Sequence, residues 1–109
     1  MVAYRRNFLP GGTFFFTVTL KDRRSTLPVE HIDRLRQAFR QAREQQPFSI
    51  LALVVLPDHL HAVLGLPAHE ADFPGRWRRI KALFTHSLVA CGIPISRCAK
   101  GEYSLWQRR

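Results

Sequence analysis

The sequence is poor in acidic residues, in cysteine and in long apolar runs, and each shortage excludes a class of protein. Its two cysteines, Cys91 and Cys98, form no Cys-x-x-Cys pair, so we expect neither a zinc site of that type nor a disulfide-rich secreted domain. No apolar run approaches the roughly 18–20 residues that a membrane-spanning helix needs. No signal-peptide core follows the N-terminus. We therefore expect a protein that does not span a membrane and carries no export signal.

Several familiar catalytic motifs are also missing. Gly11-Gly12 precedes the first apolar segment instead of following it, and no Lys-Ser or Lys-Thr pair closes a phosphate-binding loop. There is no Gly-x-Ser-x-Gly nucleophile elbow. Three histidines, His31, His69 and His86, are scattered, and we expect surface or capping roles for them. These absences argue against P-loop nucleotide hydrolysis and against α/β-hydrolase chemistry.

Positive charge is the most prominent feature that is present. Only 8 acidic residues stand against 17 Lys and Arg, of which 14 are Arg, and the net charge is +9. A small domain with this balance usually binds a polyanion, and arginine favours bidentate contacts to phosphate. A genome that prefers arginine codons is the alternative explanation.

The apolar pattern predicts one domain over residues 1–109, because 46% hydrophobic residues suffice for a single modest core. A helix is expected to begin near Pro28, with an apolar stripe of Ile32, Leu35, Phe39 and Ala42, and to end before Pro47. Strands are expected over residues 13–20, 48–56, 59–66 and 103–107, and the apolar second strand should be covered on both faces. With a second helix, this order predicts an α+β fold: a ferredoxin-like βαββαβ antiparallel sheet with two helices packed on one face.

The second helix is expected over residues 75–91 and carries a cluster of cations at its start. Its apolar stripe is Trp77, Ile80, Phe84, Leu88 and Cys91, and its first two turns hold Arg76, Arg78, Arg79 and Lys81. Cations at a helix N-terminus oppose the helix dipole. They therefore indicate an anion bound nearby, unless this is simply a solvated helix face.

The segment Leu-Pro-Asp-His-Leu-His at residues 56–61 is the sharpest local motif. In a strand, alternate side chains share a face, so His59 and His61 should point the same way while Leu60 points into the opposite layer. Two neighbouring imidazoles can hold one metal ion, or a phosphate if they are protonated. They could equally be two polar residues on a solvent-facing strand.

In its ordered motifs, the chain resembles the REP-associated tyrosine transposases, the bacterial relatives of the one-tyrosine, His-hydrophobic-His transposases that act on single-stranded DNA. Besides the histidine motif, the matching segments are Tyr4-Arg5-Arg6, Gly11-Gly12-Thr13-Phe14-Phe15-Phe16-Thr17, Pro47-Phe48, Leu66-Pro67, Asp72-Phe73, Arg76-Trp77, Ile80-Lys81, Gly101-Glu102 and Trp106-Gln107-Arg108-Arg109. The match covers essentially the whole chain.

The resemblance implies a reaction, a cofactor and partners. Family members hold Mg²⁺ or Mn²⁺ with the two histidines, here His59 and His61, and a third polar ligand, and the ion polarises the scissile phosphate. A tyrosine attacks and forms a 5′-phosphotyrosine. The implied partners are single-stranded or hairpin DNA with REP-like palindromes and a second copy of the chain, in the cytoplasm at the nucleoid. The candidate DNA contacts are Tyr4, Arg5, Arg6, Arg23, Arg24, Arg76, Arg78, Arg79, Lys81, Arg108 and Arg109.

One departure from the family concerns catalysis. The family's nucleophilic tyrosine and third metal ligand lie beyond the Trp-Gln-Arg-Arg segment, on a helix with a Tyr-Ile-His-x-Asn-Pro stretch, whereas this sequence stops at Arg109. Its two tyrosines, Tyr4 and Tyr103, match other positions of the family pattern. We therefore expect DNA binding without strand cleavage by these residues alone. The alternatives are a non-catalytic DNA-binding remnant that regulates an intact relative, and a ferredoxin-like metal- or ligand-binding domain with no nucleic-acid role.

Overall fold

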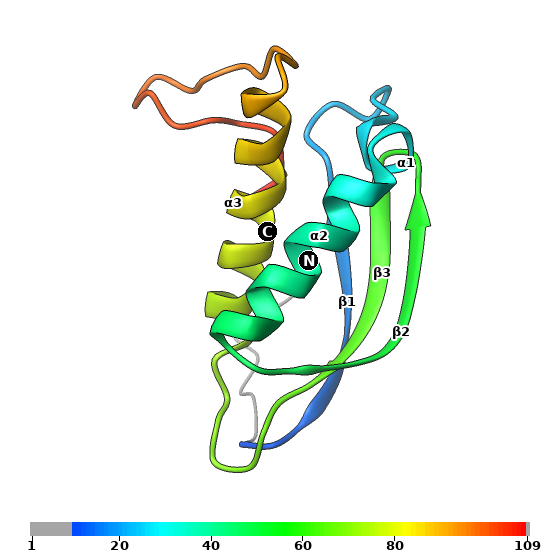
Figure 1. Cartoon of the computed structure of the whole chain (residues 1–109), viewed down its shortest axis with the longest axis vertical. Helices are drawn as coiled ribbons and strands as arrows, with labels where there is room; N and C mark the ends of the chain where they lie inside the picture. Colours follow the sequence, from blue (N-terminus) through cyan, green and yellow to red (C-terminus); the bar gives the residue numbers. More distant parts are fainter. Residues whose placement is uncertain (1–9, 109) are drawn as a thin grey trace.

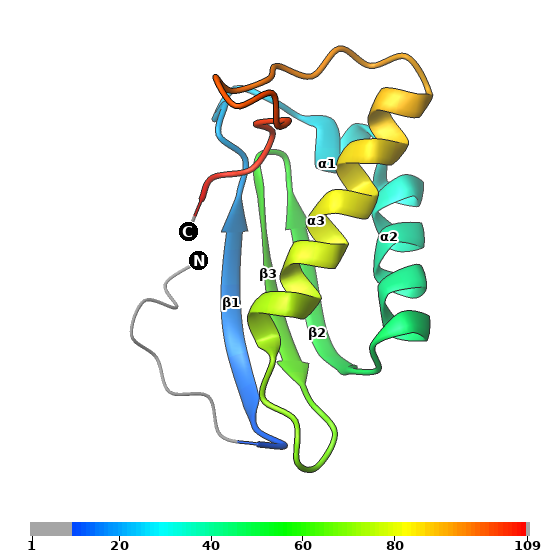
Figure 2. The same ribbon diagram turned by 90° about the vertical axis from the view of Figure 1, so that its left-hand side faces the viewer.

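The computed structural model describes residues 10–108, which form a three-stranded antiparallel sheet with helices on one face (Figure 1). The strand order is β1-β3-β2, and a turn at Pro57-Asp58 joins β2 and β3 as the predicted hairpin. Figure 2 shows α2 and α3 side by side over the same face of the sheet. The elements are β1 (Thr13–Thr19), α1 (Leu27–Glu30), α2 (Ile32–Gln45), β2 (Ser49–Leu56), β3 (His59–Gly65) and α3 (Phe73–Ala90). The predicted α+β class is confirmed.

The core lies between the sheet and the two long helices. Alternate residues of β1 and β3 point toward the helices and are buried, as period-two patterning requires. The predicted helix stripes are buried as well, except that Ile32 is half-buried and that Cys91, which caps the end of α3, is exposed. Arg34 of α2 donates to the side chain of Ser87 on α3 at 2.8 Å, which ties the two helices together. This one-sided packing leaves the other face of the sheet open.

The expected last strand is reduced to isolated bridges. Trp106 pairs with Leu20 just beyond β1, and Lys21 N–H donates to the Leu105 carbonyl at 2.9 Å. The segment therefore runs antiparallel along the outer edge of β1, where the fourth strand of a ferredoxin-like sheet lies (Figure 2). It stays short because Tyr103 instead pairs with Arg97 within the preceding loop.

Two further expectations differ from the structure. The single helix expected from Pro28 is split into α1 and α2 at His31, whose φ of −117° and ψ of 43° are not helical. The expectation that the second strand is covered on both faces is wrong for the described residues, since Leu51 and Val54 are 60% and 53% exposed. A β-bulge between Ile50 and Ala52 contributes by turning both Leu51 and Ala52 toward solvent. No helix within residues 10–108 is long and apolar enough to cross a membrane.

Candidate metal and nucleic-acid site

The two histidines of the His-Leu-His motif lie side by side on the open face of the sheet, at the start of β3. His59 is opposite Thr19 and His61 is opposite Thr17 in the register with β1. The ring centroids of the two histidines are 4.9 Å apart, with the rings nearly perpendicular at 80°. Leu60 between them is 1% exposed in the core. The prediction that both imidazoles share one face, opposite Leu60, is confirmed.

Each imidazole is held by a hydrogen bond to its Nδ1 atom. His59 Nδ1 lies 2.8 Å from Asp58 Oδ1, and His61 Nδ1 lies 2.9 Å from Thr17 Oγ1. A carboxylate can only accept, so His59 donates from Nδ1, and in the neutral ring this places the lone pair on Nε2. Outer partners of this kind are what orients histidine ligands in metal sites. The sequence motif contains Asp58 but gives no sign of Thr17, which the strand register brings to the site.

The carboxylate of Asp58 is itself fixed by an arginine. Arg23, in the loop after β1, forms an ion pair with Asp58, whose side chain is 14% exposed. The hydrogen bond from Arg23, followed by that from His59, lowers the pKa of Asp58 to about 2. Asp58 is therefore ionised at neutral pH and keeps its role as acceptor. Arg23 therefore acts on the histidine pair indirectly, by holding the Asp58 carboxylate that binds His59.

Exposed apolar side chains lie on the same open face of the sheet as the histidine pair. Phe15 stacks on His61 with a centroid separation of 5.5 Å and an interplanar angle of 20°, yet it is 57% exposed. Leu51 and Val54 of β2 are exposed on the same side. Phe15 restricts the rotation of the His61 ring and offers a flat face to a ligand. The open face thus combines two oriented imidazoles with an aromatic surface.

The residues present fit two positions of a metal ion's coordination sphere. Among residues 10–108, no group of three or more His, Cys, Asp or Glu side chains is placed to hold a metal. Two imidazole nitrogens suit Mn²⁺ better than Mg²⁺, which prefers oxygen ligands. Water, phosphate or a ligand from elsewhere would have to fill the other positions.

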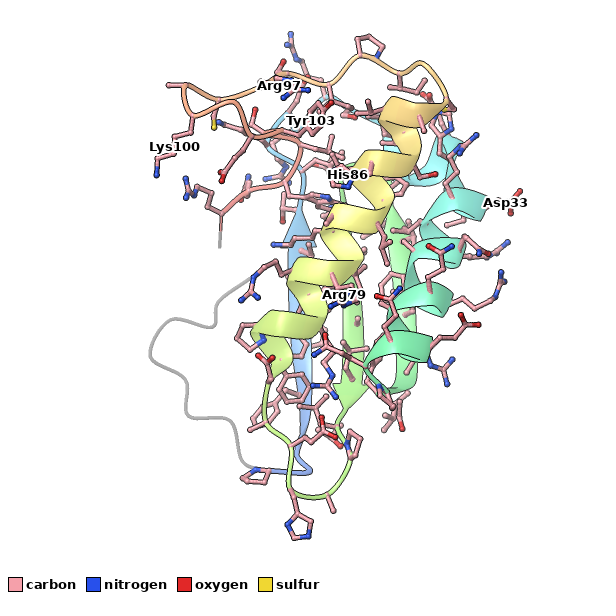
Figure 3. The ribbon with its side chains drawn as sticks, turned by 60° about the vertical axis from the view of Figure 1, so that its left-hand side comes forward. Asp33, Arg79, His86, Arg97, Lys100 and Tyr103 are labelled. Carbon is pink, nitrogen blue, oxygen red and sulfur yellow. The ribbon has the colours of Figure 1, made fainter. Side chains whose placement is uncertain are left out.

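The structure separates the predicted DNA contacts into different environments. Arg76 is 2% exposed and donates to the Pro47 carbonyl at 2.9 Å and to Glu70 at 2.5 Å. Burial thus contradicts the prediction that Arg76 contacts phosphate. Arg79 is exposed and bonds the glutamines at the end of α2 (Figure 3), and Arg24 pairs with Asp22.

Three predicted contacts from distant segments meet at one cavity. Arg78 and Lys81 of α3 and Arg108 line it together with Lys21 and Arg97. Lys21 and Arg97 belong to basic loops and were not predicted as DNA contacts. They join the cavity only because the C-terminal segment docks on α3. Tyr4, Arg5, Arg6 and Arg109 lie outside the described residues.

Known proteins resemble the chain along its whole length, although no protein-family profile matches it. It is 43% identical to the REP-associated tyrosine transposase of Escherichia coli strain K12, and 36% identical to a provisionally named protein of that family from Haemophilus influenzae. In both alignments the whole chain is covered, and it spans 59% and 63% of the length of these relatives.

Solved structures agree with these relatives. A REP-associated tyrosine transposase bound to a REP hairpin superimposes with a TM-score of 0.81 at 43% identity, covering all of this chain and 59% of the other. A protein from Deinococcus radiodurans that is provisionally named a transposase has a TM-score of 0.61 at 22% identity, covering 80% of this chain and 66% of the other, which is a likeness of fold alone. Over its whole length, the chain is therefore related to the REP-associated tyrosine transposases, as its ordered motifs predict.

Proposed function

We propose that this chain binds hairpin DNA with a single-stranded flank, and that His59 and His61 hold a divalent metal ion where the flank meets the open face of the sheet. The observation that carries the proposal is the pair of imidazoles on one strand face, both held by a hydrogen bond at Nδ1, so that Nε2 is the ring nitrogen left for a ligand. A bound ion would polarise a phosphate oxygen as a Lewis acid. The chain's own residues orient the ligands and bind the DNA.

Charge and relationship support the DNA partner. The net charge of +9 suits a polyanion, and a 43% identical relative has been solved with a REP hairpin. The exposed Phe15 beside His61 provides a stacking surface that an unpaired base can use and a duplex cannot. A protein with this role acts at the nucleoid. The ferredoxin-like binding domain without a nucleic-acid role has no observation in its favour.

The position of Tyr103 decides whether the described residues can supply the nucleophile of a cleavage reaction. Tyr103 contacts Arg97 and also His86 of α3, so it lies on the helix side of the sheet, opposite the histidine pair (Figure 3). It cannot reach a phosphate held at His59 and His61 in this fold. We infer that the described residues supply DNA and metal binding, and that a nucleophile would come from another segment.

Titration with Mn²⁺ tests the metal site directly. Paramagnetic broadening of imidazole resonances should affect His59 and His61 first, with His69, in an exposed loop, as the internal control. His61→Ala should remove the broadening of His59 as well, since one imidazole alone binds weakly. If His69 broadens before the pair does, the metal site is misassigned.

DNA binding is tested by salt dependence. The affinity for a hairpin with a 5′ flank should fall steeply as salt rises, because phosphate contacts release counterions. The flanked hairpin should also bind more tightly than a duplex of equal length. A salt-independent affinity would contradict the proposed function.

A further inference from the structure

A basic cavity on the helix side of the sheet has no role in the proposed metal site. It measures about 670 Å³ and lies between α3 and the C-terminal segment. Figure 3 shows Arg97 and Tyr103 of this segment next to His86 of α3. Five cationic side chains line the cavity from four separate parts of the chain: Lys21, Arg78, Lys81, Arg97 and Arg108.

The charge of these five cations is not balanced within the described residues. The ion pairs formed in residues 10–108 involve other basic side chains. Glu102 is the one acidic residue among those that line the cavity. Burial also lowers the pKa of Lys81, so its ammonium group is partly desolvated without a counter-charge. Cations gathered in one concave site create a positive potential that attracts an anion.

Planar side chains form one wall of the cavity and are held in place. The Arg97 guanidinium lies 4.2 Å from the centroid of the Tyr103 ring and donates to the Tyr103 hydroxyl at 2.7 Å. Arg97 also donates to the Gly101 carbonyl at 2.7 Å. Trp106 Nε1–H donates to Thr85 Oγ1 at 3.2 Å, and its ring packs on Phe84. A base can stack on such aromatic and guanidinium planes.

We propose that this cavity binds one unpaired nucleotide of single-stranded DNA, with the phosphate among Arg78, Lys81 and Arg97 and the base against Tyr103 or Trp106. The inference rests on the proposed function and adds a second DNA site, on the opposite side of the sheet from His59 and His61. The cavity has the size of a small-ligand pocket. A base must leave its duplex to enter it, so the site selects single strands over stems.

Fluorescence anisotropy with matched DNAs tests this site. The probes are a labelled hairpin with a 5′ single-stranded flank and the same hairpin with a blunt end. Arg78→Ala/Arg97→Ala should weaken binding of the flanked hairpin about tenfold, the loss expected when a stacked base and a phosphate contact are removed. Binding of the blunt hairpin should change less than about twofold, since a stem does not enter the cavity. Tyr103→Ala should show the same selectivity for the flank.

A charge-matched control separates the site from general electrostatics. Arg36→Ala/Arg40→Ala removes two exposed arginines from α2, which line a different groove. Relative to wild type, this variant should change the affinities for the flanked and the blunt hairpin by the same factor. Circular dichroism melting of every variant excludes loss of folding. Arg78→Ala alone keeps the contacts of Arg97 with Tyr103 and Gly101, and it covers the case in which the double variant unfolds.

The other outcomes overturn the proposal in distinguishable ways. If wild type prefers the flanked hairpin and the cavity variants keep that preference, the cavity is not the site, and the proposed function stands. If wild type binds neither hairpin, the proposed function fails and the cavity proposal with it. If deoxyadenosine monophosphate competes as strongly as the flanked hairpin, the cavity takes free nucleotides and not a DNA strand.

Discussion

Single residues around the histidine pair decide whether it can act as a ligand. Asp58→Asn keeps the size of the side chain but removes the charge that binds Arg23 and accepts from His59. Because outer partners of metal-bound histidines typically contribute ten- to a hundredfold in affinity, we expect Mn²⁺ affinity to fall about tenfold. Calorimetric titration measures this change. Asp33→Asn, on the exposed face of α2, is the matched control, and equal affinities in both variants would remove Asp58 from the site.

Lys81 illustrates a conflict between stability and binding. Burial lowers its pKa from 10.5, so the folded state loses its proton at a lower pH than the unfolded state does. Between the two pKa values the unfolded chain binds more protons, and stability therefore rises with pH in the window below 10.5. Below this window the buried charge costs stability. Lys81→Met should raise the melting temperature at neutral pH and should abolish the increase in stability with pH. The same substitution should weaken binding of the flanked hairpin. Unchanged thermal stability from pH 7 to 10.5 in both proteins would contradict this interpretation.

The burial of Arg76 could be predicted from helix spacing, whereas the contacts of Thr17 and Arg23 with the histidine motif could not. Arg76 follows Phe73 by three residues and precedes Ile80 by four, so it lies on the buried stripe of α3. That spacing distinguishes it from the exposed Arg78 and Arg79 once the helix is known to begin at Phe73. By contrast, Thr17 and Arg23 are separated from the histidine motif by more than thirty residues, as the sequence shows. Only the strand register and the loop contacts bring them to the site.

At the scale of elements, the start of α3 depends on one side chain. Asp72 Oδ1 accepts from Gly75 N–H at 2.8 Å and caps the helix. A Cβ atom at Gly75 would collide with that carboxylate. Asp72→Ala should therefore lower the free energy of unfolding by about 1 kcal/mol, and Gly75→Ala should also destabilise the protein because it displaces the cap. Urea unfolding checks both changes.

The comparison variant for the cap is Asp33→Ala, in the first turn of α2, where no side-chain cap is formed. It should change stability by less than about 0.5 kcal/mol, as exposed substitutions usually do. A loss as large as that of Asp72→Ala would show that general charge at the helix starts, and not the cap, is responsible.

Elements with strong periodicity could be predicted, whereas their ends depended on local contacts. The three strands and both long helices follow from apolar spacing, and the hairpin from Pro57-Asp58. The helix expected from residue 75 begins two residues earlier, at Phe73, because Pro74 suits the first helical turn. The break at His31 and the weak pairing of Trp106 have no counterpart in the apolar pattern: the backbone of His31 leaves the helical region, and Tyr103 pairs with Arg97 within its own loop.

At the scale of the whole molecule, the sheet separates two surfaces with different chemistry. The open face carries the histidine pair with Phe15, and the helix side carries the basic cavity with Tyr103. The C-terminal segment at the outer edge of β1 lies between them (Figure 2). We therefore expect a single strand that uses both surfaces to pass around this edge.

This separation predicts how residues 1–109 behave as a catalyst. Nucleophilic attack needs a tyrosine hydroxyl in line with the phosphate at near-contact distance, and Tyr103 is held against Arg97 and His86 on the opposite side of the sheet. With Mn²⁺ and a flanked hairpin, we expect DNA binding but no covalent adduct on a denaturing gel. Binding measured on the same sample ensures that a missing adduct is not a missing complex. An adduct that disappears in Tyr103→Phe would show that the C-terminal segment leaves α3 and crosses the β1 edge to the histidine pair; an adduct that disappears in Tyr4→Phe would instead assign the nucleophile to the N-terminal basic motif.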